Sequence, residues 1–168
     1  MPFSPTWYFE KIEDVSPEFL RENGVSALIL DVDNTLTTHD NPMPKAGVAV
    51  WLEKMRAAGI TMMILSNNKV ERVRPFAKAL GLPCIPNGKK PLPDGIRRTL
   101  HAMGTQREKT IVVGDQVFTD VLAGKWSGLR TLLVEPIQPE ATAFFRFKRA
   151  MEKICLAGYH RKRRKNNR

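Results

Sequence analysis

The chain has 168 residues, of which 42% are hydrophobic, so it is long enough for one domain with a full core and too short for two comfortable ones. The net charge of +10 is concentrated at one end, because residues 144–168 hold ten Lys or Arg and one acid, whereas residues 1–143 carry a net charge of only +1. We therefore expect a single nearly neutral domain over residues 1–143, with residues 1–24 packed on it, and a basic C-terminal helix and tail over residues 144–168.

The two cysteines, Cys84 and Cys155, lie far apart and form no CxxC or Cys/His pattern. The sequence thus predicts neither a disulfide framework nor a zinc site. The first residues lack the basic and apolar regions of a signal peptide, and no segment approaches the ~20 apolar residues that span a bilayer. We expect a cytoplasmic protein that is neither secreted nor membrane-spanning.

Helical and strand patterns alternate through the first half of the chain. Residues 16–24 predict a short helix, because Ser16 can cap it, Pro17 suits its first turn and Gly24 can end it. Residues 25–30 and 60–65 are continuous apolar runs, typical of buried strands. Between these two strands, apolar side chains recur at helical spacing up to Gly59: Val48, Trp51, Leu52, Met55 and Ala58.

The alternation continues to residue 134. Helical patterns lie over residues 70–80, around Ile96, Leu100 and Met103, and over residues 119–126, and strand patterns lie at residues 84–85, 110–113 and 130–134. The strands are apolar without alternation, which is typical of a parallel sheet covered on both faces. The sequence predicts an α/β fold with a doubly wound, Rossmann-like, five-stranded parallel sheet and helices on both faces.

Polar residues follow the predicted strands at the edge where such sheets bind ligands, beyond the carboxyl ends of the strands. They are Asp31, Asp33, Ser66, Asn67, Asn68 and Asp115. Asp31 and Asp33 can face the same side, because side chains alternate along an extended segment. Crowded carboxylates call for a hard cation, and an oxygen-rich site suits Mg²⁺. The hydroxyl of Ser66 and the cation of Lys90 suit the oxygens of a phosphoryl group.

Four segments occur in order, each after a strand or before a helix: DVDNT (31–35), LSNN (65–68), KKP (89–91) and GDQVFTD (114–120). Together they resemble the motifs of the haloacid dehalogenase (HAD) superfamily of phosphatases, over residues from about 25 to 134. The resemblance implies that Asp31 is the nucleophile that forms an aspartyl-phosphate. Asp33 would be the general acid and base, protonating the leaving group and then activating water.

The resemblance also implies the residues that bind Mg²⁺ and phosphate. The metal would be held by Asp31, the carbonyl of Asp33, and Asp115, with Asp120 orienting a metal-bound water. The phosphoryl group would be held by these residues: Asn34, Thr35, Ser66, Asn67 and Lys90. Lys89 could replace or assist Lys90. A simpler interpretation stays open for Ser66 and Asn67, which could cap the helix that follows them.

Phosphatases of this superfamily often select substrates with an inserted cap domain, and the 29 residues between DVDNT and LSNN leave no room for one. An open site should accept a large or anchored substrate, such as a protein side chain, a nucleic acid end or a lipid head group. Residues 5–36 and the compact spacing are similar to the YqeG family of capless phosphatases, related to the phosphatidylglycerophosphate phosphatases. That resemblance implies removal of the terminal phosphate from phosphatidylglycerophosphate.

The C-terminal residues also favour a membrane partner. Phe144, Phe147, Met151 and Ile154 recur at helical spacing among basic residues, a pattern that suits an anionic membrane surface. This would place the protein peripherally at the inner membrane face. Alternatively, the apolar side packs on the sheet and the basic end is solvated.

Two other functions stay open. The basic tail equally suits nucleic acid, as in an RNA- or ribosome-binding protein whose phosphatase site is secondary or idle. The acids at the strand ends argue against a pure binding protein, which would not need them. A phosphatase of a soluble sugar or nucleotide phosphate would keep the mechanism and change only the substrate.

Overall fold

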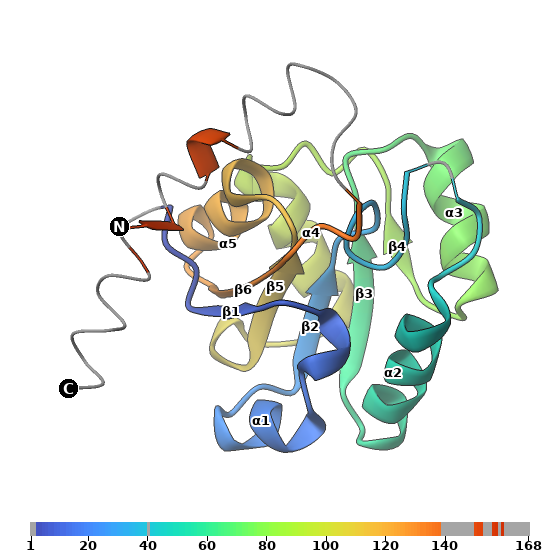
Figure 1. Cartoon of the computed structure of the whole chain (residues 1–168), viewed down its shortest axis with the longest axis horizontal. Helices are drawn as coiled ribbons and strands as arrows, with labels where there is room; N and C mark the ends of the chain where they lie inside the picture. The colour runs from blue at the N-terminus through green and yellow to red at the C-terminus, as the bar shows by residue number, and fades with distance from the viewer. Residues whose placement is uncertain (1–2, 40, 139–149, 153–155, 158, 160–168) are drawn as a thin grey trace.

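The computed structural model describes residues 3–39, 41–138, 150–152, 156–157 and 159. Within these residues, one parallel sheet of six strands has the order β1-β6-β5-β2-β3-β4 (Figure 1). The strands are β1 (Trp7–Phe9), β2 (Ala27–Leu30), β3 (Thr61–Leu65), β4 (Cys84–Ile85), β5 (Thr110–Gly114) and β6 (Arg130–Val134). The order reverses direction between β2 and β5, which is the point where ligands bind in doubly wound sheets.

The predicted fold class is confirmed, but the predicted number of five strands is wrong. The additional strand, β1, pairs with β6 so that Tyr8 lies opposite Leu133. Its three residues are too few to show a strand pattern in the sequence. Packing helps to determine its conformation, because the rings of Trp7 and Phe9 each make a T-shaped contact with the ring of Phe19, with centroids 5.5 and 5.1 Å away.

The helices follow the predicted spacing. They are α1 (Pro17–Glu22), α2 (Ala46–Ala57), α3 (Val70–Ala79), α4 (Pro93–Met103) and α5 (Leu122–Trp126). Ser16 caps α1 by accepting a hydrogen bond from the Phe19 amide, as predicted. The last helical region starts two residues earlier than predicted, because a π-helical turn, η3 (Val117–Val121), precedes α5. Short 3-10 turns occur at η1 (Ile12–Asp14) and η2 (Arg107–Lys109).

The helices cover both faces of the sheet. Leu28 and Leu30 of β2 join the core under α1, α2 and α3, whereas Ile29 joins the core under α4 and α5. Trp51 is buried as predicted, and its indole N–H donates to the Val15 carbonyl, which ties the N-terminal segment to α2. Between β2 and β3 the described residues form α2 alone, so no cap domain is inserted there.

Part of the predicted C-terminal segment lies outside the described residues, including Phe144, Phe147, Ile154 and the basic residues 160–168. Met151 is described and is 41% exposed. Among the described helices, none has the length and apolar character needed to cross a bilayer. Cys84 is a free thiol.

Candidate active site

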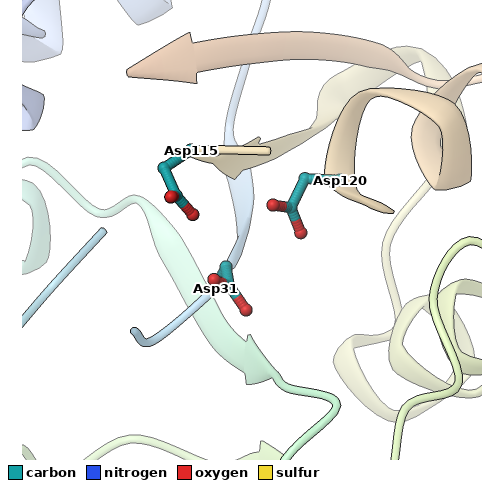
Figure 2. A group of neighbouring side chains, drawn as sticks. All are labelled: Asp31, Asp115 and Asp120. Atoms are coloured by element: carbon teal, nitrogen blue, oxygen red, sulfur yellow. The ribbon is translucent and has the colours of Figure 1, made fainter. Parts of the chain in front are cut away.

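Three carboxylates meet at the carboxyl ends of the central strands. Asp31 follows β2, Asp115 follows β5, and Asp120 lies in η3. One oxygen from each lies within 4.8 Å of the others, and Figure 2 shows the three side chains as close neighbours. Pairing of β2 with β5 aligns the strand ends, since the Asp31 amide donates to the Val113 carbonyl at 3.0 Å. Three of the acids predicted from the sequence are therefore brought together.

Lys90 reaches into this cluster. Its Nζ donates to Asp31 Oδ1 at 2.7 Å and to Asp120 Oδ1 at 2.5 Å, and its side chain is only 3% exposed. The neighbouring Lys89 is exposed and lines a separate cavity of about 590 Å³ together with Arg74. Of the two lysines that the sequence left as candidates, Lys90 is the one that contacts the acids.

Asn67 fixes the backbone of Lys90. Its amide nitrogen donates to the Lys90 carbonyl at 2.8 Å, and its amide oxygen accepts from the Lys90 N–H at 2.6 Å. The same loop lies tightly against α4, because a Cβ on Gly95 would come within 2.3 Å of the Gly88 carbonyl oxygen. These contacts aim the lysine at the acids and leave little freedom for the loop that carries it.

The charges in the cluster are only partly balanced. Burial raises the pKa of Asp31, the Lys90 ammonium lowers it and Asp120 raises it, leaving the pKa at about 6. Burial alone would lower the pKa of Lys90, but Asp120 and Asp31 outweigh it and hold the pKa above its ordinary value. When the three carboxylates are ionised, the lysine leaves two negative charges uncompensated. A divalent cation would balance them, and carboxylate oxygens are the ligands that hard cations prefer.

Asp120 is held by its own turn. Its Oδ2 accepts hydrogen bonds from the Gln116 N–H at 3.2 Å and the Thr119 hydroxyl at 3.3 Å. A Cβ on Gly114 would lie 2.2 Å from the Asp120 Cγ, so only glycine leaves room for this carboxylate beside β5. Glycine at position 114 is therefore required on steric grounds, because it leaves space for the Asp120 carboxylate.

Asp33 is buried, with 7% of its surface exposed. Its carboxylate is held by one residue just before α3 and by one in the first turn of that helix. The Asn68 amide hydrogen-bonds to Asp33 Oδ2, and the Arg72 guanidinium donates to Asp33 Oδ1 at 2.8 Å. No functional role was predicted for Asn68 or Arg72. A signal for Arg72 was present, since a cation in the first turn of a helix opposes the helix dipole and needs another reason to be there.

If Asp33 has the acid–base role that the resemblance implies, Arg72→Ala should lower kcat about tenfold with little change in KM, because Asn68 alone would then hold the Asp33 carboxylate, by one of its two oxygens. Kinetics with p-nitrophenyl phosphate would measure this effect. Arg74→Ala, an exposed arginine two residues along the same helix, is the matched control. In an Asp33→Asn background, Arg72→Ala should have no further effect; an undiminished loss there would show that Arg72 acts independently of Asp33.

The remaining predicted phosphate-binding side chains have partners within the protein. Asn34 Oδ1 accepts from the Gln138 N–H at 3.2 Å, and the Thr35 hydroxyl donates to Asp115 at 3.4 Å. Ser66 is buried, and its hydroxyl accepts from the Asn68 N–H at 3.2 Å. Neither Ser66 nor Asn67 caps α3, whose N-cap residue is Lys69. Thr35 thus contacts one of the clustered acids directly, whereas Asn34 and Ser66 bind backbone amides of nearby loops.

Comparison with known families defines the class. The family model of haloacid dehalogenase-like hydrolases matches residues 4–128. The match spans β1 to α5 and includes Asp31, Lys90 and Asp120. The chain belongs to this family.

Its relatives narrow the class to phosphatases. The chain is 36% identical over 160 residues to the "Probable phosphatase YqeG" of Bacillus subtilis (strain 168), covering 95% of this chain and 93% of that protein. It is 28% identical over 131 residues to the "Phosphoglycolate phosphatase" of Aquifex aeolicus (strain VF5), covering 73% and 60%. The protein is therefore a HAD-family phosphatase, and the predicted resemblance to YqeG is confirmed.

Solved structures share its fold. An uncharacterised protein from Listeria monocytogenes serotype 4b superposes with a TM-score of 0.58 at 18% identity, covering 70% of this chain and 85% of that one. The cobalt-bound deoxy-D-mannose-octulosonate 8-phosphate phosphatase of Haemophilus influenzae gives 0.55 at 17% identity, covering 82% and 90%. At these identities the likeness concerns the fold alone.

Proposed function

We propose that the protein is a Mg²⁺-dependent phosphomonoesterase in which Asp31 is the nucleophile. The observation that carries this proposal is the contact of Asp31 with Lys90 inside the cluster completed by Asp115 and Asp120. An Asp31 oxygen attacks phosphorus, the ester oxygen leaves with a proton, and an aspartyl-phosphate forms. Water then attacks that phosphorus, the bond between phosphorus and the Asp31 oxygen breaks, and inorganic phosphate leaves as the Asp31 carboxylate is regenerated.

Asp33 is the proposed acid and base of both steps. It protonates the departing alkoxide and then takes a proton from the attacking water. Its two oxygens are already oriented by Asn68 and Arg72, so its position does not depend on the substrate. Lys90 offsets the negative charge of Asp31 and of the phosphoryl oxygens as the two approach each other.

The bound Mg²⁺ would supply charge compensation for the phosphoryl oxygens. We assign it to Asp31, Asp115 and the Asp33 carbonyl, with Asp120 nearby. Ser66 and the backbone around Asn34 and Thr35 remain the proposed phosphate contacts. For Asn67 we propose a positioning role, since its amide already binds the backbone of Lys90.

For the substrate we propose phosphatidylglycerophosphate, hydrolysed to phosphatidylglycerol. Two features of the chain support a lipid beside the family resemblance noted from the sequence: the lack of a cap domain among residues 3–39 and 41–138, and the basic C-terminal sequence. Residues 144–168 would bind the anionic membrane surface, with about 1 kcal/mol from each basic residue that lies close to it. The enzyme would then act at the cytoplasmic face of the membrane without spanning it.

Phosphate release from phosphatidylglycerophosphate in mixed micelles with Mg²⁺, measured beside a panel of soluble phosphomonoesters, tests this proposal. We expect kcat/KM for the lipid to exceed that for every soluble ester by about 100-fold or more, because only the lipid brings the membrane surface with it. Asp31→Asn provides the blank.

Other outcomes point to other functions. Preference for a soluble ester such as phosphoglycolate, the substrate in the name of the Aquifex relative, would keep the mechanism and remove the lipid. No turnover of any ester, together with RNA binding that is lost on deleting residues 159–168, would favour the nucleic-acid alternative.

A further inference from the structure

Glu152 is a buried acid in a basic segment. It is the single acid among residues 144–168, lies in the helical residues 150–152, and is only 3% exposed. Its Oε1 accepts hydrogen bonds from the Val117 N–H at 2.9 Å and the Phe118 N–H at 3.4 Å. A carboxylate is buried at this depth only when such partners replace water.

Val117 and Phe118 begin η3, the turn that carries Asp120. The first N–H groups of a helical segment have no partner within it, and a negative charge beside them is favourable. The preceding N–H, that of Gln116, is bound by Asp120 itself. Three consecutive amides between Asp115 and Asp120 are thus held by two carboxylates, one from the turn and one from the C-terminal segment.

A second contact fixes the same segment. Leu156, four residues after Glu152 in the sequence, packs with Val117, Val121 and Leu133. Figure 1 draws the described C-terminal residues, in red, on the side of the molecule where α5 lies. One polar and one apolar contact therefore join the C-terminal segment to the turn that places Asp120.

We infer that Glu152 is a positioning residue for the metal ligands. By holding the start of η3, its carboxylate keeps Asp115 and Asp120 in the arrangement in which both face Asp31. The C-terminal segment is then coupled to the affinity of the active site for Mg²⁺. This inference rests on the proposed function, because it takes the three-acid cluster as the metal site.

The test uses full-length protein and two variants, Glu152→Ala and Glu152→Gln. Partners that orient metal ligands affect metal affinity by about 10- to 100-fold. We expect Glu152→Ala to raise the Kd for Mg²⁺ about tenfold, measured by calorimetry, and Glu152→Gln about threefold, because glutamine keeps an acceptor oxygen and loses the charge. The kcat at saturating Mg²⁺ should change less than twofold, since the reacting groups remain in place.

Matched controls separate positioning from general destabilisation. Glu22→Gln removes an exposed acid in α1, and Met151→Ala truncates the exposed neighbour of Glu152; neither should change the Kd. Hydrogen exchange should become faster at the Val117 and Phe118 amides in Glu152→Ala, and Leu156→Ala should change the Kd in the same direction. If Glu152→Ala does not fold, Glu152→Gln carries the test.

Two results would overturn the inference: an unchanged Kd for Mg²⁺ in folded Glu152 variants, or unchanged exchange at the two amides. Ester hydrolysis tests the proposed function separately from the positioning role. Wild-type protein that binds Mg²⁺ through Asp115, with the predicted loss in Glu152→Ala, but hydrolyses no ester would uphold the positioning role and remove the phosphatase chemistry.

Discussion

Asparagine at position 31 should abolish phosphate release. We expect kcat to fall by on the order of 10⁴-fold or more, as when the nucleophile of a hydrolase is removed, because an amide oxygen cannot form the acyl-phosphate. The loss should occur without unfolding. Burial raises the pKa of Asp31 in the folded protein, so its ionised form opposes folding at pH 7. Lys90 keeps its contact with Asp120 in the variant, so the neutral amide should not lower the Tm.

Two measurements check this result. Acid quenching during turnover, followed by mass spectrometry, should find a phosphate on the peptide that contains Asp31 in the wild type and none in Asp31→Asn. Asp94→Asn, which changes an exposed acid at the start of α4, should keep the wild-type rate. Phosphate on a different residue, or a substantial rate in Asp31→Asn, would refute the assignment of the nucleophile.

Methionine in place of Lys90 should weaken both the fold and the catalysis. Removing one partner of a buried ion pair costs about 3–5 kcal/mol, and here Asp31 and Asp120 would both lose their counter-charge. Urea unfolding in the presence of a chelator measures this loss. Added Mg²⁺ should recover part of it, because the cation binds the carboxylates that the lysine had neutralised. The kcat should fall about 10²- to 10³-fold.

Lys89→Met is the matched control for this substitution. It removes the same charge one residue earlier, from an exposed side chain that lines a cavity to which none of the three clustered acids contributes. Its unfolding free energy and kcat should stay close to the wild-type values. Equal losses in the two variants would show that the loop as a whole matters, and would contradict the specific role of Lys90.

The position of the acids was predictable because it depends on fold class. Apolar runs before Asp31 and Asp115 predict parallel central strands, and such strands end at a common edge. The chemistry of adjacent lysines does not distinguish Lys89 from Lys90, so the preference for Lys90 rested on the family resemblance alone. The choice between them depends on a backbone conformation that Asn67 fixes from 23 residues away.

Other features escaped prediction for related reasons. The strand β1 is too short to show a period, and its pairing with β6 joins residues far apart in sequence. The apolar spacing of the C-terminal residues favoured a membrane surface as their partner. Glu152, the acid that contacts the active-site turn, was recognisable in the sequence only as the single acid of a basic segment. A contact between such distant residues leaves no periodic signal.

The two edges of the sheet have a consequence for how copies of the protein meet in solution. Among the described strands, the edge strands β1 and β4 are the shortest, with three and two residues. An exposed edge offers unpaired amides and carbonyls on which another chain can add a strand, and short edges offer few of them. The apolar central strands thus lie between short edge strands with few unpaired backbone groups, which should limit aggregation of the folded protein through strand addition.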